Sequence, residues 1–234
     1  MIVENGVPLR AVLFDAGNTL LFLDHPRMAA AVGAALDLPL TGPALAAGAA
    51  LAARAMEARR LDDRARANAY LEALFLQAGV PPERLPEVRD CLTALHGERH
   101  LWSGTAADTH DALARLRAAG LRLGVVSNSD GRVAEALEAA GLRTYFDVVV
   151  DSALAGVEKP DPAIFRAALE VLDIPPAEAL YVGDLYEVDV IGAQAAGIPA
   201  VLLVPAGRPR PTGCATVGSL EELADDLLKE RLAS

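Results

Sequence analysis

Short apolar runs, each followed by a helical pattern, recur along this chain, and they constrain its fold more than any other feature. Continuous short runs of this kind are typical of strands that are buried on both faces of a parallel sheet. Five of them occupy residues 11–14, 121–126, 146–150, 179–182 and 200–204. Several end at a polar residue: Asp15 follows the first run, Ser127 the second, Asp151 the third, and Asp184 follows the fourth after one glycine.

The segments between these runs carry helix signals. Asp161 followed by Pro162 is a favourable helix start, because aspartate caps the first turn and proline fits its first position. Further helices are expected at residues 109–119, 130–140 and 190–196, each followed by a glycine, and from Ser219 onward. The alternation predicts an α/β fold, a Rossmann-like parallel sheet with helices on both faces. Ligands bind such sheets at the carboxyl ends of the strands, where Asp15, Ser127 and Asp184 lie.

One long segment, residues 23–102, interrupts the alternation of strands and helices. It is rich in alanine, leucine and arginine, carries helical patterns broken by proline and glycine, and has no strand signal. We therefore predict an α/β core domain formed by residues 1–22 and 103–234, and an all-α domain of about four helices formed by residues 23–102. A helical insertion beside the strand ends would act as a lid over the site.

The charge of the chain narrows the choice of partners. Its 21 basic and 32 acidic residues give a net charge of −11, and this field repels nucleic acids and anionic membranes. An anionic substrate would therefore need local positive charge from a metal ion or a lysine. The sequence contains Lys159 and Lys229 as its only lysines. Lys229 fits an exposed helix face, whereas Lys159 lies in a predicted loop, where a compact point charge suits a chemical role.

Neither the cysteines nor the first residues indicate export. Cys91 and Cys214 lie far apart and suggest neither a disulfide framework nor a metal site. Residues 1–9 lack the basic start and apolar run of a signal peptide, and no apolar stretch reaches membrane-spanning length. We therefore expect a cytoplasmic protein without a membrane segment.

Four segments carry polar residues in one recognisable order. They are Phe14-Asp15-Ala16-Gly17-Asn18-Thr19-Leu20, Val125-Val126-Ser127-Asn128, Gly156-Val157-Glu158-Lys159-Pro160-Asp161 and Val182-Gly183-Asp184-Leu185-Tyr186-Glu187-Val188-Asp189. Together they resemble the four motifs of the haloacid dehalogenase superfamily, in that superfamily's order and over nearly the whole chain. The helical insertion also falls where the superfamily has its helical cap. The resemblance implies a hydrolase of the phosphatase-like branch with a helical cap.

The resemblance also implies a role for each motif residue. Asp15 would attack phosphorus and form an aspartyl-phosphate, with Ser127 and Lys159 as the other catalytic residues. The phosphate would be bound by Ala16, Gly17, Ser127, Asn128 and Lys159. The ligands of a Mg²⁺ ion would be Asp15, the carbonyl oxygen of Gly17, Asp184 and Asp189. The expected substrate is a small phosphorylated metabolite.

The chain departs from the family pattern beside the nucleophile. Most phosphatases of the superfamily carry a second aspartate two residues after the first, which protonates the leaving group and later activates water. Here that position is Gly17, followed by Asn18 where the family usually has glycine. The acid-base group is therefore missing, and such a loss typically costs about 10²–10⁴ in rate. Asp24 or His25, just after the first strand, are the candidates to replace it.

Three functions are compatible with the sequence. The first is the Mg²⁺-dependent phosphatase, the second is a metal-independent 2-haloacid dehalogenase that uses the same Asp15, and the third is a catalytically weak relative that binds a ligand or partner. The Schiff-base chemistry of the phosphonoacetaldehyde hydrolases is excluded, because it needs a cap lysine and residues 23–102 contain none. The oligomeric state, monomer or homodimer, stays open.

Overall fold

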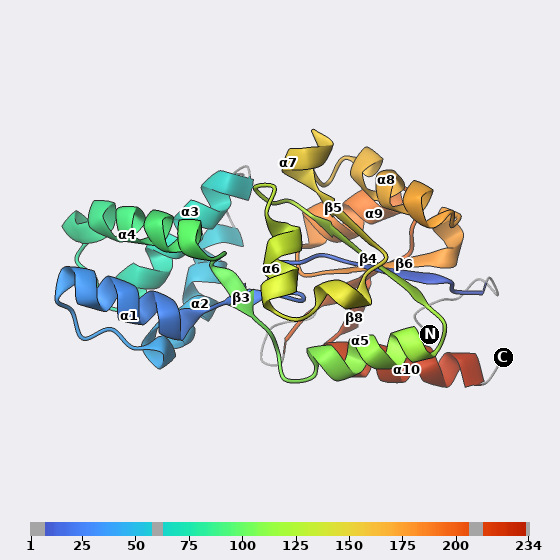
Figure 1. Cartoon of the computed structure of the whole chain (residues 1–234), viewed down its shortest axis with the longest axis horizontal. Coiled ribbons are helices and arrows are strands. Elements are labelled where there is room, and N and C mark those ends of the chain that lie inside the picture. The colour runs from blue at the N-terminus through green and yellow to red at the C-terminus, as the bar shows by residue number, and fades with distance from the viewer. Residues whose placement is uncertain (1–7, 58–62, 206–212, 233–234) are drawn as a thin grey trace. The chain divides into compact units, whose positions relative to one another are not determined.

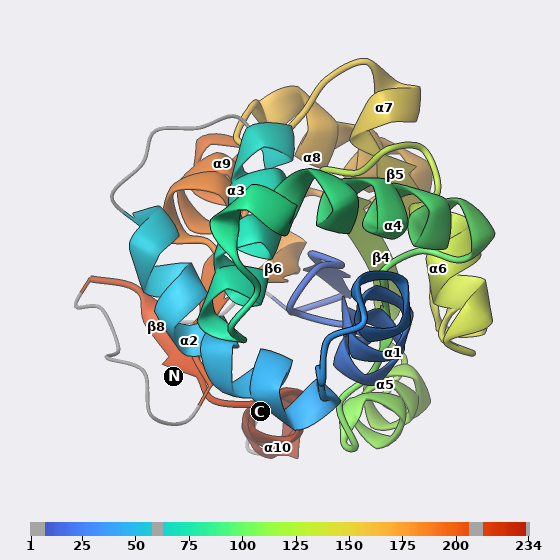
Figure 2. The same cartoon turned by 90° about the vertical axis from the view of Figure 1, so that its left-hand side faces the viewer.

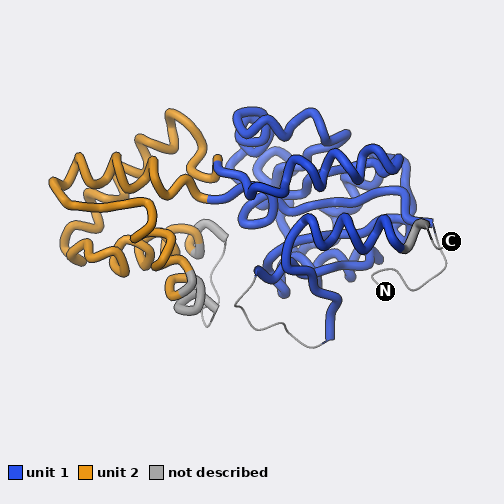
Figure 3. Tube along the Cα trace, turned by 90° about the horizontal axis from the view of Figure 1, so that it is seen from below, with its two compact units in different colours: residues 1–22, 104–234 blue, residues 23–103 orange. Residues whose placement is uncertain are grey.

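The chain divides into two compact units. The computed structural model describes residues 8–57, 63–205 and 213–232. One unit consists of residues 1–22 and 104–234, and the other consists of residues 23–103 (Figure 3). The first unit contains a parallel sheet with helices on both faces, so the predicted α/β fold is confirmed. That the second unit acts as a lid stays a prediction.

Six parallel strands form the sheet of the α/β unit, in the order β5-β4-β1-β6-β7-β8. The strands are β1 (Ala11–Phe14), β4 (Arg122–Ser127), β5 (Val148–Asp151), β6 (Ala179–Gly183), β7 (Ala200–Leu203) and β8 (Ala215–Val217). The first five overlap the five apolar runs of the sequence. Strand β8 was not predicted, because it is a short edge strand of which only Val217 is buried, so it shows no continuous apolar run.

Two further strands, β2 (Phe22–Leu23) and β3 (Trp102–Gly104), pair in a small separate sheet where the chain passes from one unit to the other. The sequence shows no strand signal at either place. Strands of two or three residues are too short to display the alternation that identifies a strand. The all-α description of residues 23–102 therefore needs this correction at both of its ends.

The pairing of the three central strands sets the position of the site. Strand β1 lies between β4 and β6, and Leu13 is level with Gly124 on one side and with Tyr181 on the other. Phe14 is level with Val125 and Val182 in the same way. The polar residues that follow these strands therefore emerge at one edge of the sheet.

Helices cover both faces of this sheet. They are α5 (Thr109–Ala118), α6 (Val133–Ala139), α7 (Ser152–Ala155), α8 (Pro162–Leu172), α9 (Ile191–Ala195) and α10 (Leu220–Leu232), with short 3₁₀ turns at Arg143–Tyr145 and Pro176–Glu178. Helices α8 and α9 lie on one face, and α5 and α10 lie side by side on the other (Figures 1 and 2). A π-helical turn, Tyr186–Val190, precedes α9, so this helix begins one residue later than predicted.

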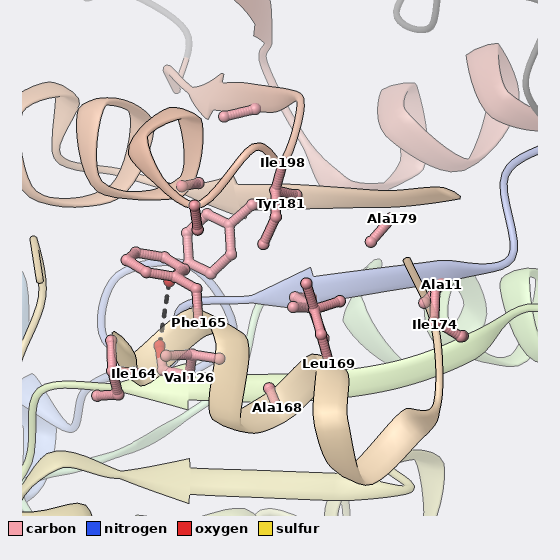
Figure 4. Packing of buried hydrophobic residues seen from close by; sticks show 14 of the residues in the cluster. Ala11, Val126, Ile164, Phe165, Ala168, Leu169, Ile174, Ala179, Tyr181 and Ile198 are labelled. Carbon is pink, nitrogen blue, oxygen red and sulfur yellow. Dashed lines mark hydrogen bonds between the residues drawn. The ribbon is translucent and has the colours of Figure 1, made fainter. Parts of the chain in front are cut away.

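An apolar core lies on the face of the sheet under α8. Helix α8 begins at the predicted cap, where the Asp161 carboxylate accepts the Ala163 N–H, and ends at Asp173 in the left-handed conformation. Its buried side chains, Phe165 and Leu169 among them, pack against the central strands (Figure 4). Burying a side chain of this size contributes about 1.5–3 kcal/mol. The core therefore anchors α8, and with it the loop that carries Lys159.

In its described residues, 23–57 and 63–103, the second unit contains four helices and the 3₁₀ turn Pro82–Arg84. The helices are α1 (His25–Leu36), α2 (Gly42–Glu57), α3 (Asp63–Gln77) and α4 (Leu85–Glu98). Helix α1 contacts α2 and α4, and α3 contacts the same two helices, around a core that includes Met28, Leu45 and Phe75. None of the helices within the described ranges combines the length and the apolar composition needed to cross a membrane.

Candidate active site

The polar residues at the strand ends meet at the carboxyl edge of the α/β unit. Asp15 directly follows β1, and its N–H donates to the carbonyl oxygen of Val182 in β6 at 2.8 Å. Ser127 is the last residue of β4, and Asp184 follows β6. Asp15 and Ser127 are buried, with 7% and 4% of their surface exposed, whereas Asp184 is half-buried. The edge therefore presents two carboxyl groups and a hydroxyl on three neighbouring strands.

Lys159 joins two of the predicted carboxylates. Its Nζ lies 2.6 Å from Oδ1 of Asp15 and 2.7 Å from Oδ1 of Asp189, and all three side chains are at most one-tenth exposed. Burial by itself would lower the pKa of the Lys159 ammonium, but the charges of Asp15 and Asp189 outweigh it and hold this pKa well above its ordinary value. Lys159 is therefore a permanent positive charge beside Asp15.

The pKa of the Asp15 carboxyl group is raised above its ordinary value. Burial raises its pKa most, Lys159 lowers it, and Asp189 raises it again, with a net value of about 6. At neutral pH the group is therefore mostly ionised, which is the form that a nucleophile needs.

The Asp189 side chain can approach Lys159 because Gly183, which lies beside it in space, has no side chain. A Cβ on Gly183 would lie between 2.3 and 2.6 Å from the side-chain atoms of Asp189. The other oxygen of the Asp189 carboxylate accepts the N–H of Leu185 at 2.9 Å. Sequence reasoning identified Asp189 but not this requirement for glycine at position 183. The requirement follows from the close approach of the two residues in space.

Three carboxyl groups of the site fit a divalent cation. One oxygen each of Asp15, Asp184 and Asp189 lies within 4.8 Å of the other two. Burial, and then repulsion from Asp15 and Asp189, hold the pKa of Asp184 well above its ordinary range. When all three are ionised, Lys159 neutralises only one of the three negative charges. A doubly charged cation with a preference for oxygen ligands, such as Mg²⁺, fits both the donors and the remaining charge.

In the turn after β1, asparagine stands at position 18, where the family usually has glycine. Asn18 has a φ of 55°, and asparagine is among the residues that tolerate this left-handed conformation. Its N–H donates to the carbonyl oxygen of Leu21 at 2.7 Å. The sequence drew attention to Asn18 only as an exception. In the structure its side chain lowers the pKa of Asp184, a predicted metal ligand, against the larger effect of burial.

Asn128 supports Lys159 with its side chain. Its Oδ1 accepts the N–H of Lys159 at 2.7 Å, and its Nδ2 donates to the carbonyl oxygen of Lys159 at 3.0 Å. The amide therefore holds the main chain of the residue whose ammonium contacts Asp15. The phosphate contacts predicted for the backbone of Ala16, Gly17 and Asn128, and the metal contact of the Gly17 carbonyl, stay predictions.

The loop after β4 is fixed by residues at the end of β5. The carboxylate of Asp151 accepts the N–H groups of Gly131 at 3.0 Å and Val133 at 3.2 Å. The hydroxyl of Ser152 accepts the N–H of Ser129 at 3.0 Å and donates to its carbonyl oxygen at 3.2 Å. These bonds order the segment that follows Ser127. Sequence reasoning placed Asp151 at a strand end but assigned it no role.

The two candidates for the missing acid belong to the other unit. The Asp24 carboxylate caps α1 by accepting the Arg27 N–H at 3.1 Å, and it forms an ion pair with Arg99 at 2.9 Å. Burial lowers the pKa of His25, against the opposing charge of Asp24. These contacts give Asp24 a structural role in the helical unit, and the proposal that either residue replaces the acid at Gly17 gains no support from them.

Tyr181 is the functional candidate that sequence reasoning missed. It lies in β6, is fully buried, and directs its hydroxyl to within 3.1 Å of Lys159 Nζ. Burial raises the pKa of this hydroxyl well above its ordinary value, so it stays protonated. One signal was available in the sequence, because a tyrosine inside an otherwise aliphatic strand usually has a hydrogen-bond partner for its hydroxyl.

Comparisons with known proteins give one consistent family. A family model described as haloacid dehalogenase-like hydrolase matches residues 9–197. Haloacid dehalogenase-like hydrolase domain-containing protein 3 of Bos taurus is 46% identical over 87 residues, which are 37% of this chain and 35% of that protein. Phosphoserine phosphatase of Thermus thermophilus is 35% identical over 162 residues, which are 68% of this chain and 63% of that protein. The matches therefore span about a third to two thirds of these relatives.

Among solved structures, a haloacid dehalogenase-type phosphatase of Thermococcus onnurineus has a similar fold. The alignment has a TM-score of 0.60 at 26% sequence identity. It covers 94% of this chain and 98% of the other. The likeness thus includes both the sheet and the helical segment between β2 and β3.

Proposed function

Because the chain belongs to the haloacid dehalogenase-like hydrolases, we propose that it is a Mg²⁺-dependent phosphatase of a small phosphorylated metabolite, with Asp15 as the nucleophile. The observation that carries this proposal is the position of the Lys159 ammonium, 2.6 Å from Asp15 and 2.7 Å from the buried Asp189, with the half-buried Asp184 in the same group of carboxyls. The names of the phosphatase relatives support it. Its cytoplasmic location stays a prediction. Its oligomeric state stays open.

The proposed reaction has two steps. An oxygen of the Asp15 carboxylate attacks phosphorus, a new O–P bond forms, and the bond from phosphorus to the leaving oxygen breaks with its electron pair. Water then attacks the aspartyl-phosphate and releases inorganic phosphate. Lys159 keeps Asp15 in place and offsets negative charge on the phosphoryl oxygens, and the Ser127 hydroxyl binds one of them. The leaving oxygen must also receive a proton.

The arrangement of the carboxyl groups supports the proposed metal site. Asp15, Asp184 and Asp189 would hold Mg²⁺, with the carbonyl oxygen of Gly17 as the further predicted ligand. The ion would neutralise charge on the transferring phosphoryl group.

Among the residues that the structure describes, the site has no evident proton donor for the leaving oxygen. Gly17 has no side chain, so the leaving oxygen has no acid at the position where related phosphatases carry aspartate. We therefore propose a slow enzyme for alkyl phosphates, whose alkoxide leaving group needs a proton. A p-nitrophenyl leaving group departs as a stable anion, so it should be less affected.

Phosphate release from p-nitrophenyl phosphate, with Mg²⁺ and with EDTA, tests the main proposal. We expect metal-dependent release that falls at least about 10³-fold in Asp15→Asn. Asp173→Asn is the matched control, because Asp173 is exposed at the end of α8 and asparagine accepts its left-handed conformation. Equal rates with EDTA, or an active Asp15→Asn variant, would contradict the proposal. Metal-independent chloride release from 2-chloropropionate would instead identify the dehalogenase.

Gly17→Asp tests the explanation for slow turnover. The glycines that take a positive φ in the described chain do not include Gly17, so an aspartate backbone is compatible with this position. We expect the variant to hydrolyse an alkyl phosphate, such as phosphoserine, at least about tenfold faster, with a smaller gain for p-nitrophenyl phosphate. Equal gains would argue against a missing acid. Activity in Gly17→Asp alone would identify the natural chain as a catalytically weak ligand-binding relative.

A further inference from the structure

We propose that Tyr181 is a positioning residue for Lys159: its hydroxyl fixes the lysine ammonium and connects it to the main chain of β4 beside Ser127. This inference rests on the proposed function for its effect on turnover. Its geometry stands on contacts within the α/β unit alone. Tyr181 is not among the residues predicted to bind the phosphate or the metal, and in our proposal it acts through Lys159.

The Lys159 ammonium has three N–H donors and finds three oxygen acceptors. They are Oδ1 of Asp15 at 2.6 Å, Oδ1 of Asp189 at 2.7 Å and the Tyr181 hydroxyl at 3.1 Å. A lysine side chain has four rotatable bonds and is flexible unless its end is held. Two carboxylates alone would draw the ammonium toward the metal ligands. The hydroxyl supplies the third point that fixes its position.

The Tyr181 hydroxyl is itself held by the neighbouring strand. Its oxygen lies 3.1 Å from the carbonyl oxygen of Val126 and donates its proton there, as the dashed line in Figure 4 shows. Asp189 Oδ1 lies at 3.2 Å and is the alternative acceptor. Because Val126 directly precedes Ser127, one hydroxyl links the lysine to the strand that carries the predicted phosphate ligand. The two groups proposed to bind phosphate thus share one support.

The ring of Tyr181 has little freedom to move. It contacts the ring of Phe165 edge to face, with centroids 4.9 Å apart and an angle of 77°. Phe165 is in turn confined by α9, because a Cβ on Gly192 would lie 2.8 Å from its ring. A phenol ring that is packed in this way carries its hydroxyl at a defined height above the sheet. Packing in the apolar core therefore fixes the Tyr181 hydroxyl, and this hydroxyl in turn fixes the Lys159 ammonium.

Loss of the hydroxyl should affect the reaction step more than substrate binding. Tyr181→Phe keeps the ring and its packing, but it leaves one buried N–H of Lys159 without an acceptor. The ammonium can then shift toward Asp15 and Asp189, and charge stabilisation by a misplaced group weakens in the transition state. We expect kcat to fall about tenfold while KM changes less than about twofold.

Two measurements on purified full-length protein test the inference. The first compares kcat and KM of wild type, Tyr181→Phe and the control Tyr145→Phe, using p-nitrophenyl phosphate with Mg²⁺. Tyr145 is a suitable control because its hydroxyl faces His110, 3.4 Å from Nδ1, in an exposed contact of the same unit. A drop in kcat for Tyr181→Phe alone supports the inference. Unchanged kcat, or equal loss in both variants, overturns it.

The second measurement does not depend on activity. The sequence contains two lysines, so ¹⁵N-lysine labelling yields two ammonium signals, and the Lys229 side chain is 72% exposed and serves as the internal reference. We expect the Lys159 protons to exchange with water at least about tenfold faster in Tyr181→Phe, with Lys229 unchanged. Unchanged Lys159 exchange overturns the inference even if the protein is a phosphatase. Faster exchange in a protein without phosphatase activity refutes the proposed function only.

Discussion

Two groups of ionic side chains, one in each unit, are built in opposite ways. In the α/β unit, Lys159 is buried between Asp15 and Asp189, with 3% of its side chain exposed. In the helical unit, Asp24 pairs with Arg99, and their side chains are 24% and 48% exposed. The first group carries excess negative charge, whereas the second pairs opposite charges near water.

This difference is what we expect if the first group serves the proposed chemistry and the second serves folding. Arg27 illustrates the second case, because its guanidinium donates to the carbonyl oxygens of Leu95, Arg99 and His100 at the end of α4. Such contacts join α1 to α4 at a modest desolvation cost. Burying two carboxyls around one lysine, with the half-buried Asp184 beside them, is expensive in a low-dielectric interior, and stability alone does not require it. We therefore expect opposite responses to mutation in the two groups.

The largest effect is expected for Lys159→Met. This change leaves Asp15 and Asp189 buried without a counter-charge, and breaking a buried pair in this way typically lowers the free energy of unfolding by about 3–5 kcal/mol. Urea denaturation at pH 8 with EDTA measures it. Lys229→Met is the control, because an exposed surface substitution changes stability by about 0.5 kcal/mol or less. Similar values for both variants would show that the buried group is not an ionic network.

Asp184→Asn should have the opposite sign. Because the pKa of Asp184 is raised in the folded protein, its ionised form costs stability at every pH above the ordinary range of the group. Asparagine removes this cost, so we expect the variant to be about 1 kcal/mol more stable than wild type at pH 8 in EDTA. Thermal unfolding should also show a rise in Tm with Mg²⁺ for wild type and a much smaller rise for the variant. A variant that is less stable than wild type in EDTA would contradict repulsion between Asp184 and the carboxyl groups of Asp15 and Asp189.

Substitutions at Asp24 test the exposed ion pair of the helical unit. Asp24→Ala removes both the cap of α1 and the ion pair, and we expect a loss of about 1 kcal/mol. Asp24→Asn keeps a capping oxygen and removes only the charge, so the loss should be about 0.5 kcal/mol or less. Urea denaturation separates the two contributions. Equal losses would mean that the ion pair, not the cap, supports the helix.

The smallest effect is expected at Asp147, an exposed ion pair of the α/β unit. Burial favours a higher pKa, but the Leu123 N–H and the charges of Arg122 and Arg117 outweigh it, so the pKa of Asp147 is lowered. Its contribution is then present above the unfolded-state pKa of about 3.9 and is lost as pH falls through the lower folded-state value. We expect Asp147→Asn to lose at most about 1 kcal/mol at pH 7 and less in high salt. The difference from wild type should shrink as the pH falls below about 3.9 and vanish once the pH is below the lowered folded-state pKa.

Sequence reasoning reached the family and the edge of the sheet where the polar residues meet. The family prediction is confirmed by the match over residues 9–197, and Asp15, Lys159, Asp184 and Asp189 do come together. Their chemical roles stay proposals. The position of these residues was predictable because polar side chains directly after buried parallel strands must emerge at one edge.

The supporting residues were not predictable in the same way. Tyr181 lies within an apolar run, so its pattern indicates only burial, and the target of its hydroxyl depends on which strands lie beside β6. Asn128 contacts Lys159 across 31 residues of sequence, and nothing local indicates that pairing. Strand β8 escaped notice because a short edge strand lacks the continuous apolar run of a central one.

The sequence by itself determined the order of five strands and the helices between them, the motif residues and the absence of an acid at position 17, because these depend on local periodicity and residue type. The tertiary structure decided what those residues touch. Strand order placed β1 between β4 and β6, and only this arrangement lets Tyr181 of β6 reach Val126 of β4 and Lys159 together. Contacts between distant segments depend on packing and register, which no local pattern encodes.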